Sequence, residues 1–116
     1  QVRGIFTGAA LAPPRLEEVA TQLRQGEGDV RELVRHLTRT GFLTHVSADM
    51  FVATEALAQL RRRLVEHLTQ HGEITTQDFK TLVGASRKHV IPLAEFFDRE
   101  KTTLRVGEKR VLRRKG

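Results

Sequence analysis

The tripeptide Ser86-Arg87-Lys88 has the residue types of an anion-binding site. It follows the turn-forming pair Gly84-Ala85 and precedes apolar residues with helical spacing, so we expect it at the start of a helix. The N–H groups and the dipole of a helix start favour anions, and two cations there do not serve local stability. A phosphate held by the free N–H groups, the Ser86 hydroxyl and both cations would explain this choice of residues. The alternative is two solvated surface cations without a partner.

A second group of cations lies near the end of the chain. Residues 102–106 and 109–113 have the residue types of strands and flank Gly107-Glu108, which predicts a β-hairpin with a two-residue type II′ turn. The cations close to its tip are Arg105, Lys109 and Arg110. We expect this tip beside the helix start at Ser86, so that together they form one basic surface.

Other kinds of site find little support in the sequence. The chain has no cysteine, which excludes disulfides, thiolate metal sites and a cysteine nucleophile. His67 and His71 have the i, i+4 spacing of a metal pair, but the glutamate of an HExxH motif and an evident third ligand are missing. A nucleophile elbow, a GxxxxGK[ST] loop and a dinucleotide fingerprint are also missing. We therefore expect no catalytic residue, no metal and no cofactor in this chain.

The elements that carry these residues can be read from apolar spacing. Helical stripes predict helices near residues 16–23, 30–37, 54–70, 76–83 and 86–99. Short β-prone runs at 42–46 and 50–53 predict a first hairpin, and the run around Gly107 is the second. Phe79, Phe96 and Phe97 lie on or near apolar helix faces, so we assign them to the core rather than to a base-stacking platform.

Each half thus has helices followed by a small hairpin, which is the order of a winged-helix module. We predict a helix-rich α+β fold of two tandem winged-helix modules, with a near-neutral, spacer-like module at 1–53 and a basic module at 54–116. One alternative is a single mixed domain with four short strands.

Positive charge is concentrated in the second half. The 116 residues have a net charge of +6. Residues 1–58 hold six Lys or Arg against seven Asp or Glu, and residues 59–116 hold fourteen against seven. A polyanionic partner should therefore bind the second half. We interpret the cations at 61–63 and the tail cations Arg113, Arg114 and Lys115 as solvated. No apolar run is long enough for a membrane span, and no signal peptide is evident.

From residue 74 to 113 the sequence resembles the last winged-helix domain of the bacterial selenocysteine-specific translation elongation factor, SelB. The residues that carry the resemblance are Phe79, Gly84, Ser86-Arg87-Lys88, Ile91-Pro92-Leu93, Glu95, Phe97-Asp98-Arg99 and the segment 105–110. Residues 42–57 and the following helix also look like the preceding domain of that family. Because the chain begins with Gln1 rather than Met, we expect it to be part of a longer protein.

The resemblance implies a cytoplasmic role in protein synthesis. In that family the last module binds the messenger-RNA hairpin that recodes UGA as selenocysteine, and the rest of the factor is a GTPase that carries selenocysteyl-tRNA to the ribosome. The GTPase motifs are not found in this sequence, so only hairpin binding, by a monomer, carries over. The resemblance implies RNA contacts by Ser86, Arg87, Lys88, Arg99, Arg105, Gly107, Lys109 and Arg110.

Two other functions fit a winged helix. A transcription regulator would place the helix at 86–99 in a DNA major groove, although no dimerisation helix is evident. A protein-binding adaptor fits the near-neutral first half better than the second.

Overall fold

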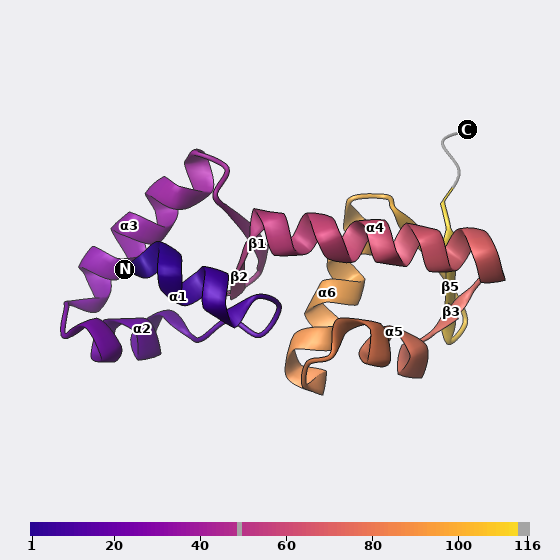
Figure 1. Cartoon of the computed structure of the whole chain (residues 1–116), viewed down its shortest axis with the longest axis horizontal. Helices are drawn as coiled ribbons and strands as arrows, with labels where there is room; N and C mark the ends of the chain where they lie inside the picture. The colour runs from indigo at the N-terminus through magenta and orange to yellow at the C-terminus, as the bar shows by residue number, and fades with distance from the viewer. Residues whose placement is uncertain (49, 114–116) are drawn as a thin grey trace. The chain divides into compact units, whose positions relative to one another are not determined.

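The structure is a computed structural model that describes residues 1–48 and 50–113. The chain divides into two compact units, Gln1–Leu57 and Ala58–Gly116 (Figure 1). This boundary falls inside the long helix α4 (Thr54–His71), whereas the sequence analysis placed the division just before that helix.

In the first unit, three helices precede a β-hairpin. The helices are α1 (Val2–Ala9), α2 (Leu16–Leu23) and α3 (Glu27–Arg39), and the strands are β1 (Leu43–Ser47) and β2 (Met50–Ala53). The strands pair antiparallel, with Leu43 opposite Ala53. Apolar side chains from the three helices and β1 form one buried core: Val2, Phe6, Leu16, Val19, Ala20, Val30, Val34, Leu37 and Leu43. The sequence analysis did not predict α1, which contributes Val2 and Phe6 to this core.

The second unit has its own helices and its own sheet. After α4 come β3 (Ile74–Thr75), α5 (Thr76–Val83), α6 (Arg87–Arg99), β4 (Thr103–Val106) and β5 (Lys109–Leu112). The sheet has the order β3-β5-β4, with both pairs antiparallel. Strands β4 and β5 form a hairpin that we call the wing.

The core of the second unit lies between its helices and the sheet. Each helix presents an apolar stripe with period 3.6, which is why these segments are helical and why they pack together. Phe97 of α6 is fully buried, and its ring meets that of Phe79 of α5 edge-on at a centroid distance of 6.3 Å. The other core residues are Leu60, Leu64, Leu68, Ile74, Val83, Val90, Leu93 and Ala94.

The fold class predicted from the sequence is confirmed: helix-rich winged-helix architecture with small sheets. The two sheets are separate, and each belongs to one unit. The chain is therefore not one mixed domain built on four strands.

Candidate nucleic-acid interface

The start of α6 is positioned by a tight turn after α5. Gly84 ends α5 with φ of 70°, a left-handed conformation that glycine adopts without strain. The chain then extends at Ser86, which has φ of −71° and ψ of 159° and is the N-cap of α6. Arg87 and Lys88 consequently lie in the first turn of the helix.

The side chain of Ser86 does not cap α6. Its Oγ lies 3.1 Å from Nδ1 of His89, whereas the Ser86 carbonyl accepts from the N–H groups of His89 and Val90. By contrast, α5 has an ordinary start, where Thr75 Oγ1 accepts from the N–H of Asp78 at 3.1 Å. The N–H groups of Arg87 and Lys88, the first two residues of α6, therefore remain available to a ligand.

The charge in the first turn also distinguishes α6 from helices α2 to α5. Each of those four has an acidic residue in the first turn, whereas α1 and α6 have none. Arg87 and Lys88 are exposed, and neither forms an ion pair or side-chain hydrogen bond with residues 1–48 or 50–113. Because nothing in this part of the chain neutralises the two cations, the site can receive an anion.

The wing is built as the sequence predicted. Val106 pairs with Lys109, which leaves Gly107 and Glu108 as the two turn residues. Gly107 has φ of 63°, the sign that a type II′ turn requires at its first central position. Arg105 is exposed, and its Nε donates to the Gly107 carbonyl at 3.0 Å. Leu104 and Val106 face solvent on the other side of the strand, with 48% and 56% of their surface exposed.

Two of the wing cations have carboxylate partners. Lys109 Nζ lies 2.7 Å from Glu73 Oε2, and this hydrogen bond and the charge of Glu73 raise the pKa of Lys109. Arg110 is buried, with 9% of its surface exposed, and its Nε and one terminal NH₂ group donate to both carboxylate oxygens of Asp98 at 3.0 to 3.1 Å. Arg110 thus does not have the exposed position that we expected for a residue that contacts RNA.

Arg99 lies at the opposite end of α6 from Arg87 and Lys88. It is exposed in the last turn of α6, and its guanidinium carbon is 5.9 Å from the centre of the Phe96 ring. Of the tail cations, Arg113 is exposed, and Arg114 and Lys115 lie outside the described residues.

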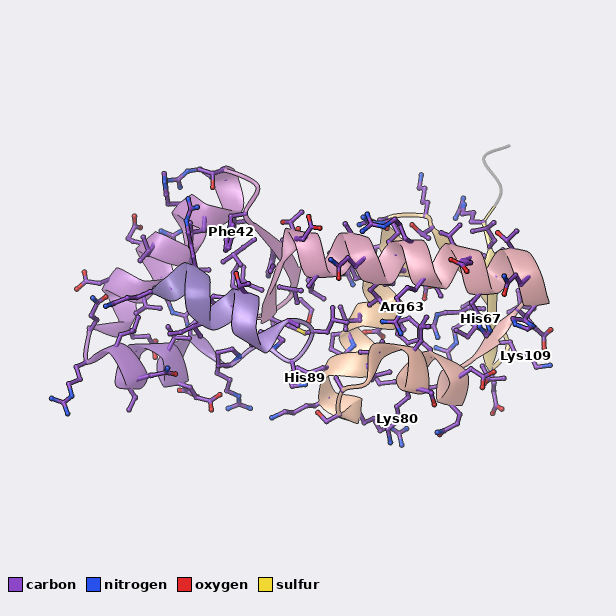
Figure 2. All side chains as sticks on the ribbon, viewed as in Figure 1. Phe42, Arg63, His67, Lys80, His89 and Lys109 are labelled. Atoms are coloured by element: carbon purple, nitrogen blue, oxygen red, sulfur yellow. The ribbon has the colours of Figure 1, made fainter. Side chains whose placement is uncertain are left out.

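The helix start and the wing do not adjoin each other. In Figure 2, His89 at the start of α6 and Lys109 at the start of β5 lie on opposite sides of the second unit, and Lys80 of α5 lies between them. The expectation that the tip of the wing lies beside the helix start is therefore wrong. Lys80, which the sequence analysis missed, is exposed and has no ion-pair partner in the described part of the chain. In the sequence, the feature that could have pointed to Lys80 is that it is a lone lysine in the last turn of the helix now seen as α5.

Comparison with known families identifies the second unit. A family described as "Elongation factor SelB, winged helix" matches residues 66–112. The second unit belongs to the SelB winged-helix family. The selenocysteine-specific elongation factor of Desulfomicrobium baculatum is 31% identical over 110 residues, which are 95% of this chain and 17% of that protein. The factor of Haemophilus influenzae is 26% identical over 100 residues, which are 86% of this chain and 16% of that protein. The chain thus spans about a sixth of the length of these relatives.

Solved structures show the same fold over nearly the whole chain. The mRNA-binding domain of elongation factor SelB from E. coli, solved in complex with SECIS RNA, matches with a TM-score of 0.81 and 22% identity, covering 97% of both chains. A bacterial selenocysteine-specific elongation factor, EF-Sec, matches with a TM-score of 0.77 and 22% identity, covering 97% of this chain and 18% of that one. The likeness therefore extends from the SelB winged helix into the first unit.

The aromatic residues of this SelB winged helix serve packing. The sequence has no tryptophan or tyrosine, and Phe79 and Phe97 are 3% and 0% exposed. Phe96 is half-buried and lies edge-on to Phe97. The prediction that these three belong to the core is confirmed for Phe79 and Phe97, so neither ring can stack on a base.

Residues 1–48 and 50–113 contain neither a cluster of metal-ligating side chains nor a helix suited to span a membrane. Within this part of the chain, no group of three or more His, Asp or Glu could hold a metal ion, although the rings of His67 and His71 are 4.5 Å apart. None of the helices described here is both long and apolar enough to cross a membrane.

Proposed function

We propose that this chain binds the messenger-RNA hairpin that directs selenocysteine insertion at UGA, as the C-terminal part of a selenocysteine-specific elongation factor. Three findings support the proposal: the SelB family match, the names of the two relatives, and the fold shared with an mRNA-binding domain solved with SECIS RNA. By the same relationship, the GTPase activity and the contacts with selenocysteyl-tRNA and the ribosome belong to other parts of a cytoplasmic factor. The near-neutral first unit would act mainly as a spacer.

The observation that carries the proposal is the uncapped, cationic start of α6. Arg87 and Lys88 are exposed without a carboxylate partner in the described residues, and the adjacent helix N–H groups have no side-chain cap. A phosphate bound there gains charge-assisted hydrogen bonds and the favourable end of the helix dipole. Solvated surface cations alone would not explain why the N-cap side chain is also withdrawn from the helix start.

RNA geometry limits how such a surface can read a hairpin. The major groove of A-form RNA is deep and narrow, so α6 cannot lie in it as a recognition helix lies in DNA. Specific binding to RNA generally uses unpaired loop bases, and phosphate contacts fix the register. Ser86, Arg87 and Lys88 would hold the backbone, and Lys80, Arg105 and Lys109 would extend the contact across α5 and the wing. Contacts by Arg99 and Gly107 remain predictions from the family resemblance.

Fluorescence anisotropy with three labelled ligands tests the proposal. The ligands are the selenocysteine-insertion hairpin from the same genome, the same hairpin with a scrambled loop, and a DNA duplex, each at two salt concentrations. We expect tight binding to the first hairpin and much weaker binding to the other two. Equal, steeply salt-dependent binding to all three would refute specific recognition, and a preference for the duplex would favour the alternative, a DNA-binding regulator.

A further inference from the structure

A buried polar cluster joins the end of α6 to both strands of the wing. Asp98 lies in the last turn of α6, Thr103 begins β4, and Arg110 is the second residue of β5. Thr103 Oγ1 donates to Asp98 Oδ1 at 2.6 Å, and Arg110 makes three hydrogen bonds to the same carboxylate at 3.0 to 3.1 Å. Thr103 and Arg110 are 1% and 9% exposed. One carboxylate thus binds two side chains, one from each strand of the hairpin.

The register of the wing explains why the carboxylate is needed. Arg105 and Arg110 are directly opposite each other across β4 and β5, so their side chains leave the same face of the hairpin. Two like charges in this position repel each other, and a buried guanidinium without a partner is costly. Asp98 neutralises Arg110, while Arg105 turns to the carbonyl of Gly107.

We propose that Arg110 is a positioning residue for RNA binding rather than a residue that contacts RNA. Through Asp98 it fixes the wing on the end of α6, which sets where Arg105 and Lys109 meet the RNA while Arg87 and Lys88 hold it at the other end of the same helix. This inference rests on the proposed function. It predicts that Asp98 and Thr103 have a measurable effect on RNA affinity, although neither residue carries a positive charge.

Direct contact and positioning predict opposite effects for Asp98→Asn. This substitution removes one negative charge and loosens the hold on Arg110. If Arg110 contacted phosphate directly, Asp98→Asn would leave affinity unchanged or raise it, and Arg110→Gln would lower the salt slope by about one. If Arg110 positions the wing, Asp98→Asn and Arg110→Gln each weaken hairpin binding about three- to tenfold. The double variant then binds the hairpin with at least the affinity of whichever single variant binds less tightly.

The experiment is a titration of the whole chain with the cognate hairpin for wild type, the two single variants and the double variant. Thermal unfolding of each variant establishes that it is folded at the titration temperature. Glu95→Gln is the matched charge control, because Glu95 is an exposed carboxylate of the same helix. It should bind the hairpin as well as wild type or better. Thr103→Val keeps the shape of the side chain and changes no charge, so it tests the cluster even if Asp98→Asn fails to fold; we expect about two- to threefold weaker binding.

The outcomes separate this inference from the proposed function. If wild type does not prefer the cognate hairpin, the proposed function fails and the inference fails with it. If wild type binds the hairpin but Asp98→Asn or Thr103→Val binds equally well or better, the inference alone is overturned. Weaker binding by folded Asp98→Asn, despite its higher net positive charge, supports it.

Discussion

Replacing Arg87 and Lys88 by glutamate should stabilise the fold while it abolishes RNA binding. Both side chains are exposed in the first turn of α6, and neither has a partner within residues 1–48 or 50–113. The substitution therefore removes no ion pair or side-chain hydrogen bond within the described residues, and acidic residues at this position interact favourably with the helix dipole. Each contributes roughly 0.3–1 kcal/mol, so the free energy of unfolding should rise by about 1 kcal/mol in the double variant.

The same substitution removes both proposed phosphate contacts. A hydrogen bond to a charged group contributes roughly 1.5–3 kcal/mol, so the loss of two corresponds to at least about 3 kcal/mol. Since 1.4 kcal/mol is a tenfold change, hairpin affinity should fall by a factor of about a hundred or more. Arg87→Gln with Lys88→Gln should reduce the slope of log K against log salt by roughly 1.4–1.8, at 0.7 to 0.9 per phosphate.

Anisotropy titrations and urea unfolding measure these two effects. The matched control is Arg62→Glu with Arg63→Glu, which changes the net charge equally at two exposed positions of α4. It should weaken binding far less. The reasoning is refuted if the Arg87 and Lys88 variant retains its affinity, or if both double variants lose affinity equally, since general basicity would then account for binding.

Three further predictions concern the fold. Phe97→Ala, at a fully buried position, should destabilise the second unit by about 3–5 kcal/mol in urea unfolding, and a loss below 1 kcal/mol would contradict its place in the core. Gly107→Val should cost about 1–2 kcal/mol because φ is 63° there, and an unchanged urea midpoint would refute the turn assignment. Partial burial works to raise the pKa of Glu100, but hydrogen bonds from Arg61 and Thr102 and the charge of Arg61 outweigh it and lower the pKa below 4.5. The pairing of Glu100 with Arg61 and Thr102 therefore stabilises the fold above pH 4.5, and this stabilisation is lost as the pH falls through the lowered pKa of Glu100. The melting temperatures of wild type and Glu100→Gln should converge over this fall in pH. A difference in melting temperature that stays constant with pH would contradict the pairing.

The helices with clear apolar stripes were predictable from the sequence, and α1 shows where that reasoning failed. Val2, Ile5 and Phe6 have helical spacing, and Val2 and Phe6 are buried in the first unit. Two glycines inside the segment lower its helix propensity by about 1 kcal/mol each, so its helical state depends on packing against α2, α3 and β1. Strand β3 has two residues, which is too short to show the alternation of apolar and polar residues that predicts a strand. It is a strand because it pairs with β5.

The candidate site was predictable in part. The position of Arg87 and Lys88 at a helix start follows from local signals, and the structure confirms it. The partners of Arg110 and Lys109 depend on contacts between residues distant in sequence, because Asp98 and Glu73 meet them only when β5 packs beside α6 and β3. For the same reason, the separation of the wing from the helix start could not be read from residue spacing.

The central claim, that the start of α6 holds the hairpin backbone, is tested most directly by amide chemical-shift mapping of the whole chain during titration with the cognate hairpin. The account predicts the largest shifts at Arg87, Lys88 and His89, with further shifts in the wing and small ones in the first unit. It is contradicted if the hairpin binds while these amides stay unperturbed, or if the largest shifts lie in α3.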